Sequence, residues 1–170
     1  NDYPAFHGDE KPFDPAPLLR FQHICLCGAN YYASKLPDFG GWFVWDKRDG
    51  MTSNDQSDCE LAWTNRACAA RIFRHRWNGM IKDSEHGTKR IHPTQKPVAL
   101  FRWVITQMKI PFDTIIVDPY MGSGSCGIAA AELGYKFIGG EIVAHYFQLA
   151  KKRLEGAYKQ TLMFTPELFP

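Results

Sequence analysis

The residues best suited to chemistry form a glycine loop in the second half of the chain. Residues 117–127 read V-D-P-Y-M-G-S-G-S-C-G, and Gly122, Gly124 and Gly127 fit the spacing G-x-G-x-x-G. Glycines at this spacing let the backbone turn tightly and approach a ligand closely. Glu141 follows 14 residues after Gly127, at the end of the next expected strand, where a carboxylate can accept hydrogen bonds from ribose hydroxyls. The pattern indicates a site for an adenosine-containing cofactor.

Asp118-Pro119 bears on which cofactor this is, because it ends the apolar strand that leads into the loop. A dinucleotide would place its pyrophosphate over the loop, where the Asp118 carboxylate would repel it. A carboxylate suits instead a cofactor with cationic ammonium and sulfonium centres. A purely structural interpretation also exists, in which Asp118 caps a turn and the glycines permit a helix to pack closely on a strand. The loop alone leaves both interpretations open.

A second motif precedes the helix that leads into the same strand. Residues 92–97 read H-P-T-Q-K-P, which combines two rigid prolines with threonine, glutamine and lysine. Such side chains at a helix N-terminus can bind a carboxylate. In isolation the motif would equally fit an ordinary loop before a helix.

The elements that position the two motifs alternate between strand and helix. The apolar patterns predict strands at 114–118 and 137–141 and helices at 97–108, 125–133 and 146–154. Ser125 is expected to cap the middle helix and Gly134 to end it. This alternation predicts a parallel α/β sheet.

The first half of the chain has shorter and less regular elements. It predicts strands at 21–27, 42–45 and 60–64, a loop at 48–58, an irregular lead-in at 1–17 and no clear element at 66–96. The 170 residues are 45% apolar, which is enough for a folded core and argues against general disorder. No apolar run approaches the roughly 18 residues of a membrane helix.

Together these motifs resemble those of the amino-methylating DNA methyltransferases, which make N6-methyladenine or N4-methylcytosine. The resemblance is to phage-type members whose catalytic half precedes the cofactor half. H-P-T-Q-K-P-V at 92–98 is similar to the family's motif beside the cofactor's methionine end, and 118–126 to its D-P-F-x-G-S-G-T-T. F-I-G-G-E-I at 137–142 resembles its ribose-binding segment, and the run from Ile24 to Thr64 is similar as well.

The resemblance implies a Rossmann-like, three-layer α/β methyltransferase fold with a mostly parallel and incomplete sheet. It implies a single domain over 1–170, divided into the remainder of a catalytic half at 13–65, a short basic target-recognition region at 66–91, a cofactor-binding half at 92–156 and a tail at 157–170. The implied reaction is methyl transfer from S-adenosyl-L-methionine to an exocyclic amine of a flipped base, adenine N6 in preference to cytosine N4, without a metal. Such enzymes often belong to restriction-modification systems.

The implied cofactor-binding residues come from all three motifs. They are His92, Thr94, Gln95, Lys96, Pro97, Asp118, Pro119, Tyr120, Gly122, Ser123, Gly124, Ser125, Glu141 and Ile142.

A basic segment marks where double-stranded DNA is expected to bind. Residues 66–96 carry eight Lys and Arg against two acidic residues, a local charge of +6 in a chain whose net charge is +2. Clustered arginines with aromatic neighbours suit phosphate contact and base reading. The implied DNA-binding residues are Arg66, Arg71, Arg74, Arg76, Lys82, Lys89 and Arg90. The compartment implied is the cytoplasm of a bacterium or of a phage-infected host.

One family motif has no counterpart. The catalytic D-P-P-Y precedes the segment that resembles residues 21–30, and here Asn1-Asp2-Tyr3-Pro4 and Phe13-Asp14-Pro15 do not match it. We therefore expect the natural polypeptide to extend before Asn1, or a homodimer partner or other segment to supply this strand. The alternatives are a catalytically inactive or split-subunit relic that binds cofactor or nucleic acid and, on G-x-G-x-x-G alone, a nicotinamide-dependent oxidoreductase.

Overall fold

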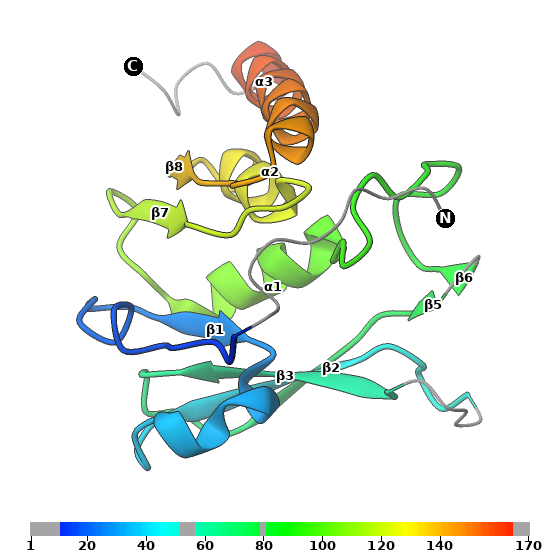
Figure 1. Cartoon of the computed structure of the whole chain (residues 1–170). Helices are drawn as coiled ribbons and strands as arrows, with labels where there is room; N and C mark the ends of the chain where they lie inside the picture. The colour runs from blue at the N-terminus through cyan, green and yellow to red at the C-terminus, as the bar shows by residue number, and fades with distance from the viewer. Residues whose placement is uncertain (1–10, 52–56, 79–80, 165–170) are drawn as a thin grey trace. The chain divides into compact units, whose positions relative to one another are not determined.

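The computed structural model describes residues 11–51, 57–78 and 81–164 (Figure 1). These residues form two compact units, which divide between His86 and Gly87. We call residues 11–86 the N-terminal unit and residues 87–164 the C-terminal unit. Residues 1–4, which do not match the family's catalytic motif, lie outside the described residues.

The N-terminal unit is built on a four-stranded sheet in the order β1-β3-β2-β4. The strands are β1 (Cys25–Cys27), β2 (Gly41–Asp46), β3 (Cys59–Thr64) and β4 (Arg71–Arg74), and two short 3-10 helices span Ala29–Tyr31 and Ala33–Lys35. β3 pairs antiparallel with both neighbours, whereas β2 and β4 run parallel. Trp63 on β3 is buried with Ile24, Leu26 and Ala29, and this cluster holds the sheet against the preceding segment.

β1 is shorter than the strand predicted from Phe21, and the reason is a single side chain. Asn65 donates from Nδ2 to the carbonyls of Phe21 and Gln22, at 3.3 and 3.0 Å, and its Oδ1 accepts from the amide of Ile24 at 3.0 Å. Because the asparagine satisfies these backbone groups, residues 21–24 need no ladder partner. The predicted strands at 42–45 and 60–64 are confirmed as β2 and β3.

The basic segment has more structure than its irregular pattern suggests. β4 continues directly into a hairpin of β5 (Trp77–Asn78) and β6 (Ile81–Lys82), which pair antiparallel with Trp77 opposite Lys82. Periodicity does not reveal strands of two to four residues, since such short runs hold too few alternations.

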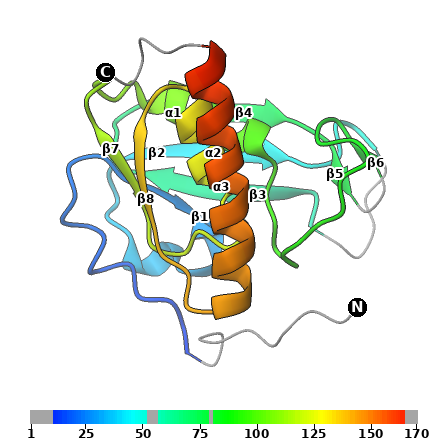
Figure 2. The same ribbon diagram turned by 90° about the horizontal axis from the view of Figure 1, so that it is seen from above.

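The C-terminal unit alternates strand and helix as predicted. Its elements are α1 (Val98–Met108), β7 (Ile115–Asp118), α2 (Ser125–Glu132), β8 (Lys136–Gly139) and α3 (Ala144–Phe164). β7 and β8 are parallel neighbours, with Asp118 opposite Gly139. α2 packs against α1, α3 and both strands. The long α3 lies along α2 and β8 in Figure 2. A buried cluster of Ile105, Ala129 and Ala130 joins α1 to α2, with Ile116 of β7 and Phe137 of β8 packed against it.

The ends of the helices differ from the prediction in two places. Ser125 is the first residue of α2 rather than its cap, because Gly124, at φ 77°, takes the cap position and no side chain caps this end. Gly134, at φ 78°, ends the helix as predicted, since a left-handed backbone is easiest for glycine. α3 runs on to Phe164, well beyond the predicted end at Leu154 and into the predicted tail.

Two glycines explain how closely α2, β8 and α3 pack. A Cβ at Gly127 would meet Leu154 and Phe137, and a Cβ at Gly139 would meet Met121 and the same Phe137 ring. The absence of a side chain at these two positions therefore lets α2, β8 and α3 pack more closely than any other residue would allow. Gly127 fits the glycine spacing but lies in α2, within the predicted helix at 125–133, where it serves close packing, one of the two interpretations that the loop alone leaves open.

The opposite face of the β7–β8 pair is apolar and open. Ile115, Val117 and Ile138 are each about half exposed, while Ile116 and Phe137 pack inward. Among the described residues, β7 has β8 as its one ladder partner. None of the described helices is both long and apolar enough to cross a membrane.

Candidate cofactor-binding site

The candidate site lies where the parallel strands β7 and β8 end. Ligands of open α/β sheets bind at this carboxyl edge. The loop after β7 and the loop after β8 are joined by backbone hydrogen bonds: the Gly140 amide donates to the Asp118 carbonyl at 2.9 Å, and the Met121 amide to the Gly140 carbonyl at 2.8 Å. The backbones of the two loops are therefore joined to each other.

Positive φ angles shape the glycine loop. Gly122 has φ 50° and Gly124 has φ 77°, values that residues with a side chain rarely adopt. The Gly124 amide donates to the Met121 carbonyl at 2.7 Å, which closes a tight turn just before α2. The tight turn thus accounts for glycine at two of the three positions in G-x-G-x-x-G.

Glu141 links the two loops through both of its carboxylate oxygens. Oε2 accepts a hydrogen bond from the Gly122 amide at 3.0 Å, and Oε1 accepts one from the Val143 amide at 2.9 Å. A carboxylate oxygen has a second lone pair, so each remains able to accept a hydroxyl. The carboxylate is thus held in place for the predicted contact with a ribose.

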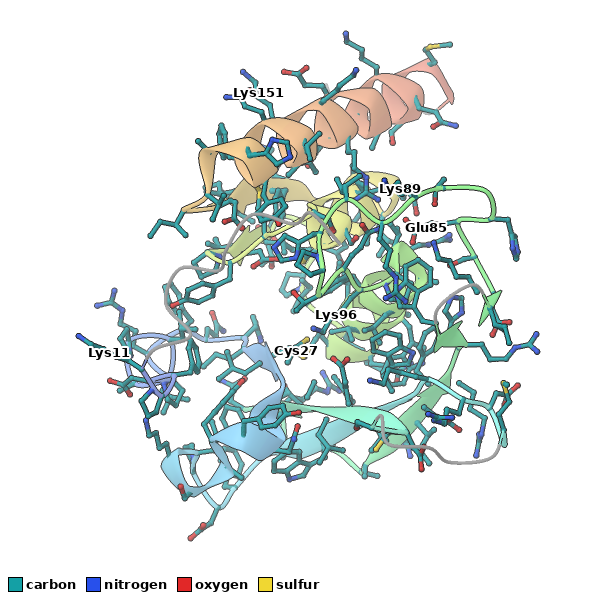
Figure 3. All side chains as sticks on the ribbon, turned by 45° about the vertical axis from the view of Figure 1, so that its right-hand side comes forward. Lys11, Cys27, Glu85, Lys89, Lys96 and Lys151 are labelled. Atoms are coloured by element: carbon teal, nitrogen blue, oxygen red, sulfur yellow. The ribbon has the colours of Figure 1, made fainter. Side chains whose placement is uncertain are left out.

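Asp118 is the second acid of the site. Burial is the largest effect and raises the pKa of its carboxyl, and the charge of Glu141 raises it further. Two neighbours oppose this and lower the pKa: the Tyr120 amide, which donates to Oδ1 at 3.0 Å, and the Lys96 ammonium. The Asp118 carboxylate therefore interacts electrostatically with the charges of both Glu141 and Lys96. Figure 3 labels Lys96 on the segment that leads into α1. A cationic ligand group would relieve the repulsion between the two carboxylates.

The His92 imidazole packs against the glycine loop at Gly122. A Cβ at Gly122 would contact its imidazole at 3.5 Å, and the ring packs edge-on against Tyr146, with centroids 4.4 Å apart. Burial lowers the pKa of His92, an effect that Glu141 opposes and Lys96 reinforces. The Thr94 amide donates to Nδ1 at 3.3 Å, so that nitrogen acts as an acceptor and the ring is neutral.

α3 supports the loop from the other side. Arg153 donates from Nη1 to the Ser123 carbonyl at 2.5 Å, and a Cβ at Gly124 would lie 3.2 Å from Ala150. With Tyr146, these side chains follow the i, i+4, i+7 spacing of one helix face. Sequence reasoning placed Arg153 on this helix without assigning it a contact, although that spacing was visible.

The predicted cofactor residues fall into three groups. Asp118, Glu141, Lys96, His92 and Gly122 gather at the strand ends, as described above. Side chains that are buried and thus support the site from inside are Gln95, Pro97, Ser123 and Ser125. Gln95 accepts from the Ile91 amide at 3.0 Å, and the two serine hydroxyls lie 3.1 Å apart.

The remaining members are open to a ligand. Tyr120 is 66% exposed and Ile142 is 80% exposed, and they follow β7 and β8 respectively. Large apolar side chains at both loops suit the faces of an adenine ring. Pro119 and Thr94 are exposed as well. No group of three or more metal-ligating side chains gathers within the described ranges.

The predicted DNA-binding residues are divided between the two units. Arg66, Arg71, Arg74, Arg76 and Lys82 belong to the N-terminal unit, while Lys89 and Arg90 belong to the C-terminal unit. Arg71, Arg74 and Arg76 are exposed. Sequence reasoning missed Asp46 and Asp83, the acids that pair with Arg74 and Arg76.

The parallel β7–β8 pair with its packed helices, the glycine loop and the two acids at the strand ends are features of a Rossmann-like methyltransferase fold. A solved structure described as the M1.HpyAVI–SAM complex has a TM-score of 0.51 to this chain at 33% identity, over 74% of this chain and 67% of that one. The DNA methylase family model N6_N4_Mtase matches residues 44–152. The chain belongs to this family of DNA methylases.

Curated relatives match a shorter stretch. Type II methyltransferase M2.DpnII of Streptococcus pneumoniae is 38% identical over 79 residues, which are 46% of this chain and 29% of the relative. DNA adenine methyltransferase YhdJ of Escherichia coli (strain K12) is 44% identical over 66 residues, 39% of this chain and 22% of that protein. The matches thus span less than a third of these curated relatives' length.

Proposed function

We propose that this chain binds S-adenosyl-L-methionine and serves the methylation of DNA at an exocyclic amine, adenine N6 in preference to cytosine N4. The observation that carries the proposal is the pair of acids at the strand ends, Asp118 and Glu141, beside a glycine loop whose backbone Glu141 holds. The names of the relatives support the reaction class.

The residues present fit this cofactor group by group. Glu141 would accept hydrogen bonds from the ribose hydroxyls, and Tyr120 and Ile142 would enclose the adenine. Asp118 would face the cationic amino-acid end, and Lys96 and Thr94 would bind its carboxylate. When bound, the cofactor supplies an electrophilic methyl group, and the protein's part is to hold and orient it.

Calorimetric titration tests the cofactor assignment. We expect S-adenosyl-L-methionine and S-adenosyl-L-homocysteine to bind, and Glu141→Gln to weaken both, because an amide has one acceptor oxygen for two backbone amides. NAD should not bind, since its pyrophosphate would meet Asp118. Binding of NAD without S-adenosyl-L-methionine would favour the oxidoreductase alternative.

The substrate proposed is double-stranded DNA, contacted by the basic residues named above. Charge reversal at Arg74 and Arg76 should weaken binding to a duplex and flatten its salt dependence, because fewer counterions are released. Transfer of labelled methyl groups to duplex DNA tests the reaction itself. Unchanged affinity and salt slope would remove these residues from the interface.

We further propose that the strand bearing the catalytic D-P-P-Y comes from outside the described residues, from the same polypeptide or from a partner. The open β7 edge and the exposed Ile115, Val117 and Ile138 support this, since a buried sheet avoids unpaired edges and apolar faces. An intact mass of the natural polypeptide, with sedimentation analysis of its oligomeric state, tests it. The proposed compartment is the cytoplasm of a bacterial or phage-infected cell, where DNA is accessible.

A further inference from the structure

The hairpin of the N-terminal unit carries an ion pair, Arg76 with Asp83, of which the proposed function uses only the positive charge of Arg76. β5 and β6 pair Trp77 with Lys82, and the pairing continues one residue further on each side, where the Asp83 amide donates to the Arg76 carbonyl at 3.1 Å. Arg76 and Asp83 therefore stand opposite each other and on one face of the ribbon. They are on the other face from Trp77 and Lys82.

Asp83 holds the Arg76 side chain in one orientation. Its Oδ2 accepts from the Arg76 amide at 2.6 Å, and its Oδ1 accepts from Arg76 Nε at 2.8 Å. Burial works to raise the pKa of Asp83, but these hydrogen bonds and the arginine charge outweigh it, so that the pKa lies below its usual value. The carboxylate is thus ionised at neutral pH and locks the guanidinium through Nε.

The outer edge of the same guanidinium points to solvent. The side chain of Arg76 is 46% exposed, and within the described residues its two Nη atoms make no hydrogen bond. A guanidinium held at Nε presents its Nη donors as a preset fork. Arg74 differs, because its Nε lies 3.8 Å from Asp46 Oδ2, beyond hydrogen-bond distance, and its side chain is 61% exposed.

The back of the hairpin is anchored to the sheet. The His75 amide donates to the Asp46 carbonyl at 3.0 Å, and Trp45 Nε1 donates to the His75 carbonyl at 2.9 Å. His75 Nε2 lies 2.8 Å from Ser84 Oγ, and Lys82 Nζ lies 4.9 Å from the centre of the Trp77 ring. These contacts join both strands on the face opposite Arg76, so the ribbon is a stiff support.

We propose that the β5–β6 hairpin enters the major groove of duplex DNA and that Arg76, oriented by Asp83, reads a guanine. The inference rests on the proposed function and adds a specificity-determining residue to it. The major groove admits a two-stranded ribbon, and an arginine fork on guanine O6 and N7 is the commonest specific contact there. Arg74, which is loosely held, contacts phosphate without distinguishing sequences.

Selection from a duplex library with a randomised central stretch tests the proposal with the full chain. The wild type should enrich a motif that contains guanine at one position. Arg76→Lys keeps the charge and its pairing with Asp83 but loses the fork, so preference at that position should fall about 5- to 140-fold, the equivalent of one bidentate contact. Asp83→Asn should also reduce the preference, because it removes the negative charge and leaves one acceptor oxygen where the carboxylate uses two, one for the Arg76 amide and one for Nε.

Two comparison variants separate base reading from charge. Arg74→Gln should lower affinity for every sequence alike. Arg102→Lys, at an exposed arginine on α1 whose Nε lies 3.5 Å from Glu132, should leave the motif unchanged. Duplex RNA should compete poorly, since its deep, narrow major groove does not admit a ribbon.

Several outcomes would overturn the proposal. The same motif selected by wild type and by Arg76→Lys would remove Arg76 as a reader, while leaving DNA binding and cofactor binding intact. Duplex binding by the wild type without any enriched motif, or equal competition by RNA, would also refute it. Absence of both duplex binding and cofactor binding would refute the proposed function itself.

Discussion

Replacing Gly127 and Gly156 by alanine, one at a time, tests whether the structure describes the packing of the C-terminal unit. Both glycines lie in helices, in α2 and α3 respectively. In an exposed helix, alanine stabilises relative to glycine by about 1 kcal/mol. Propensity alone therefore predicts the same gain at both sites, and any difference reports on tertiary contacts.

The two sites differ in what a new Cβ would touch. At Gly156 nothing lies within 4 Å, whereas at Gly127 the Cβ would fall 2.5 Å from Leu154 Cδ2 and 2.6 Å from Phe137 Cε1. The leucine methyl can move, but the Phe137 ring is also confined by Gly139. Overpacking of this kind costs roughly 2 kcal/mol. We expect Gly156→Ala to raise the free energy of unfolding by about 1 kcal/mol and Gly127→Ala to lower it by about 1 kcal/mol.

Urea unfolding followed by far-ultraviolet circular dichroism measures the difference between the two variants. Equal slopes in urea for the two variants would show that the unfolded states are comparable. If Gly127→Ala were as stable as Gly156→Ala, or more stable than wild type, the close approach of α2 to β8 and α3 would be wrong.

Three further predictions concern the candidate site. Arg153→Gln removes the charged donor to the Ser123 carbonyl and should weaken S-adenosyl-L-methionine binding about tenfold, the value of one charge-assisted hydrogen bond. Lys152→Gln, on the exposed face of α3, should leave that affinity unchanged. If calorimetry finds equal affinities for the two variants, Arg153 does not support the loop. Burial raises the pKa of Asp118, so its ionised form lowers the stability of the folded chain at neutral pH. Asp118→Asn should therefore raise the thermal midpoint at pH 7 while it lowers cofactor affinity. The gain in stability should shrink as the pH falls, because the wild-type carboxyl then becomes protonated. Burial lowers the pKa of His92 from 6.5, so above pH 6.5 the imidazole is neutral in the folded and in the unfolded chain. Below about pH 6.5 the unfolded chain binds a proton more readily than the folded chain, so the free energy of unfolding should fall as the pH falls. A His92→Asn variant with an equally steep fall would refute this.

Much of the C-terminal unit follows from local patterns. The apolar run that ends at Asp118 and the helical spacing after Pro97 are each carried by one short continuous segment, and both elements form where they are predicted, as β7 and α1. Gly122, Gly124 and Gly134 adopt the positive φ that explains their residue type. Such features depend on backbone preference and on alternation, which are written in neighbouring residues.

Other features depend on groups far apart in the chain. Asn65 accounts for the late start of the predicted strand by binding Phe21 and Gln22, residues more than 40 positions away. This outcome does not show in a local pattern, since it depends on a side chain that only the folded chain brings to residues 21–24. The position of Ser125 is a local matter: its neighbour Gly124 takes the left-handed cap conformation, so Ser125 becomes the first residue of the helix.

The same division holds for the candidate site. Motifs in the chain name the glycine loop, Asp118 and Glu141 as a place for an adenosine cofactor. Only the folded unit shows that Glu141 holds the loop by its two oxygens, that Arg153 supports it from α3, and that Arg76 is oriented by Asp83. Residue types state what chemistry is possible, but hydrogen bonds have strict distances and directions, and tertiary packing alone sets which donors and acceptors meet.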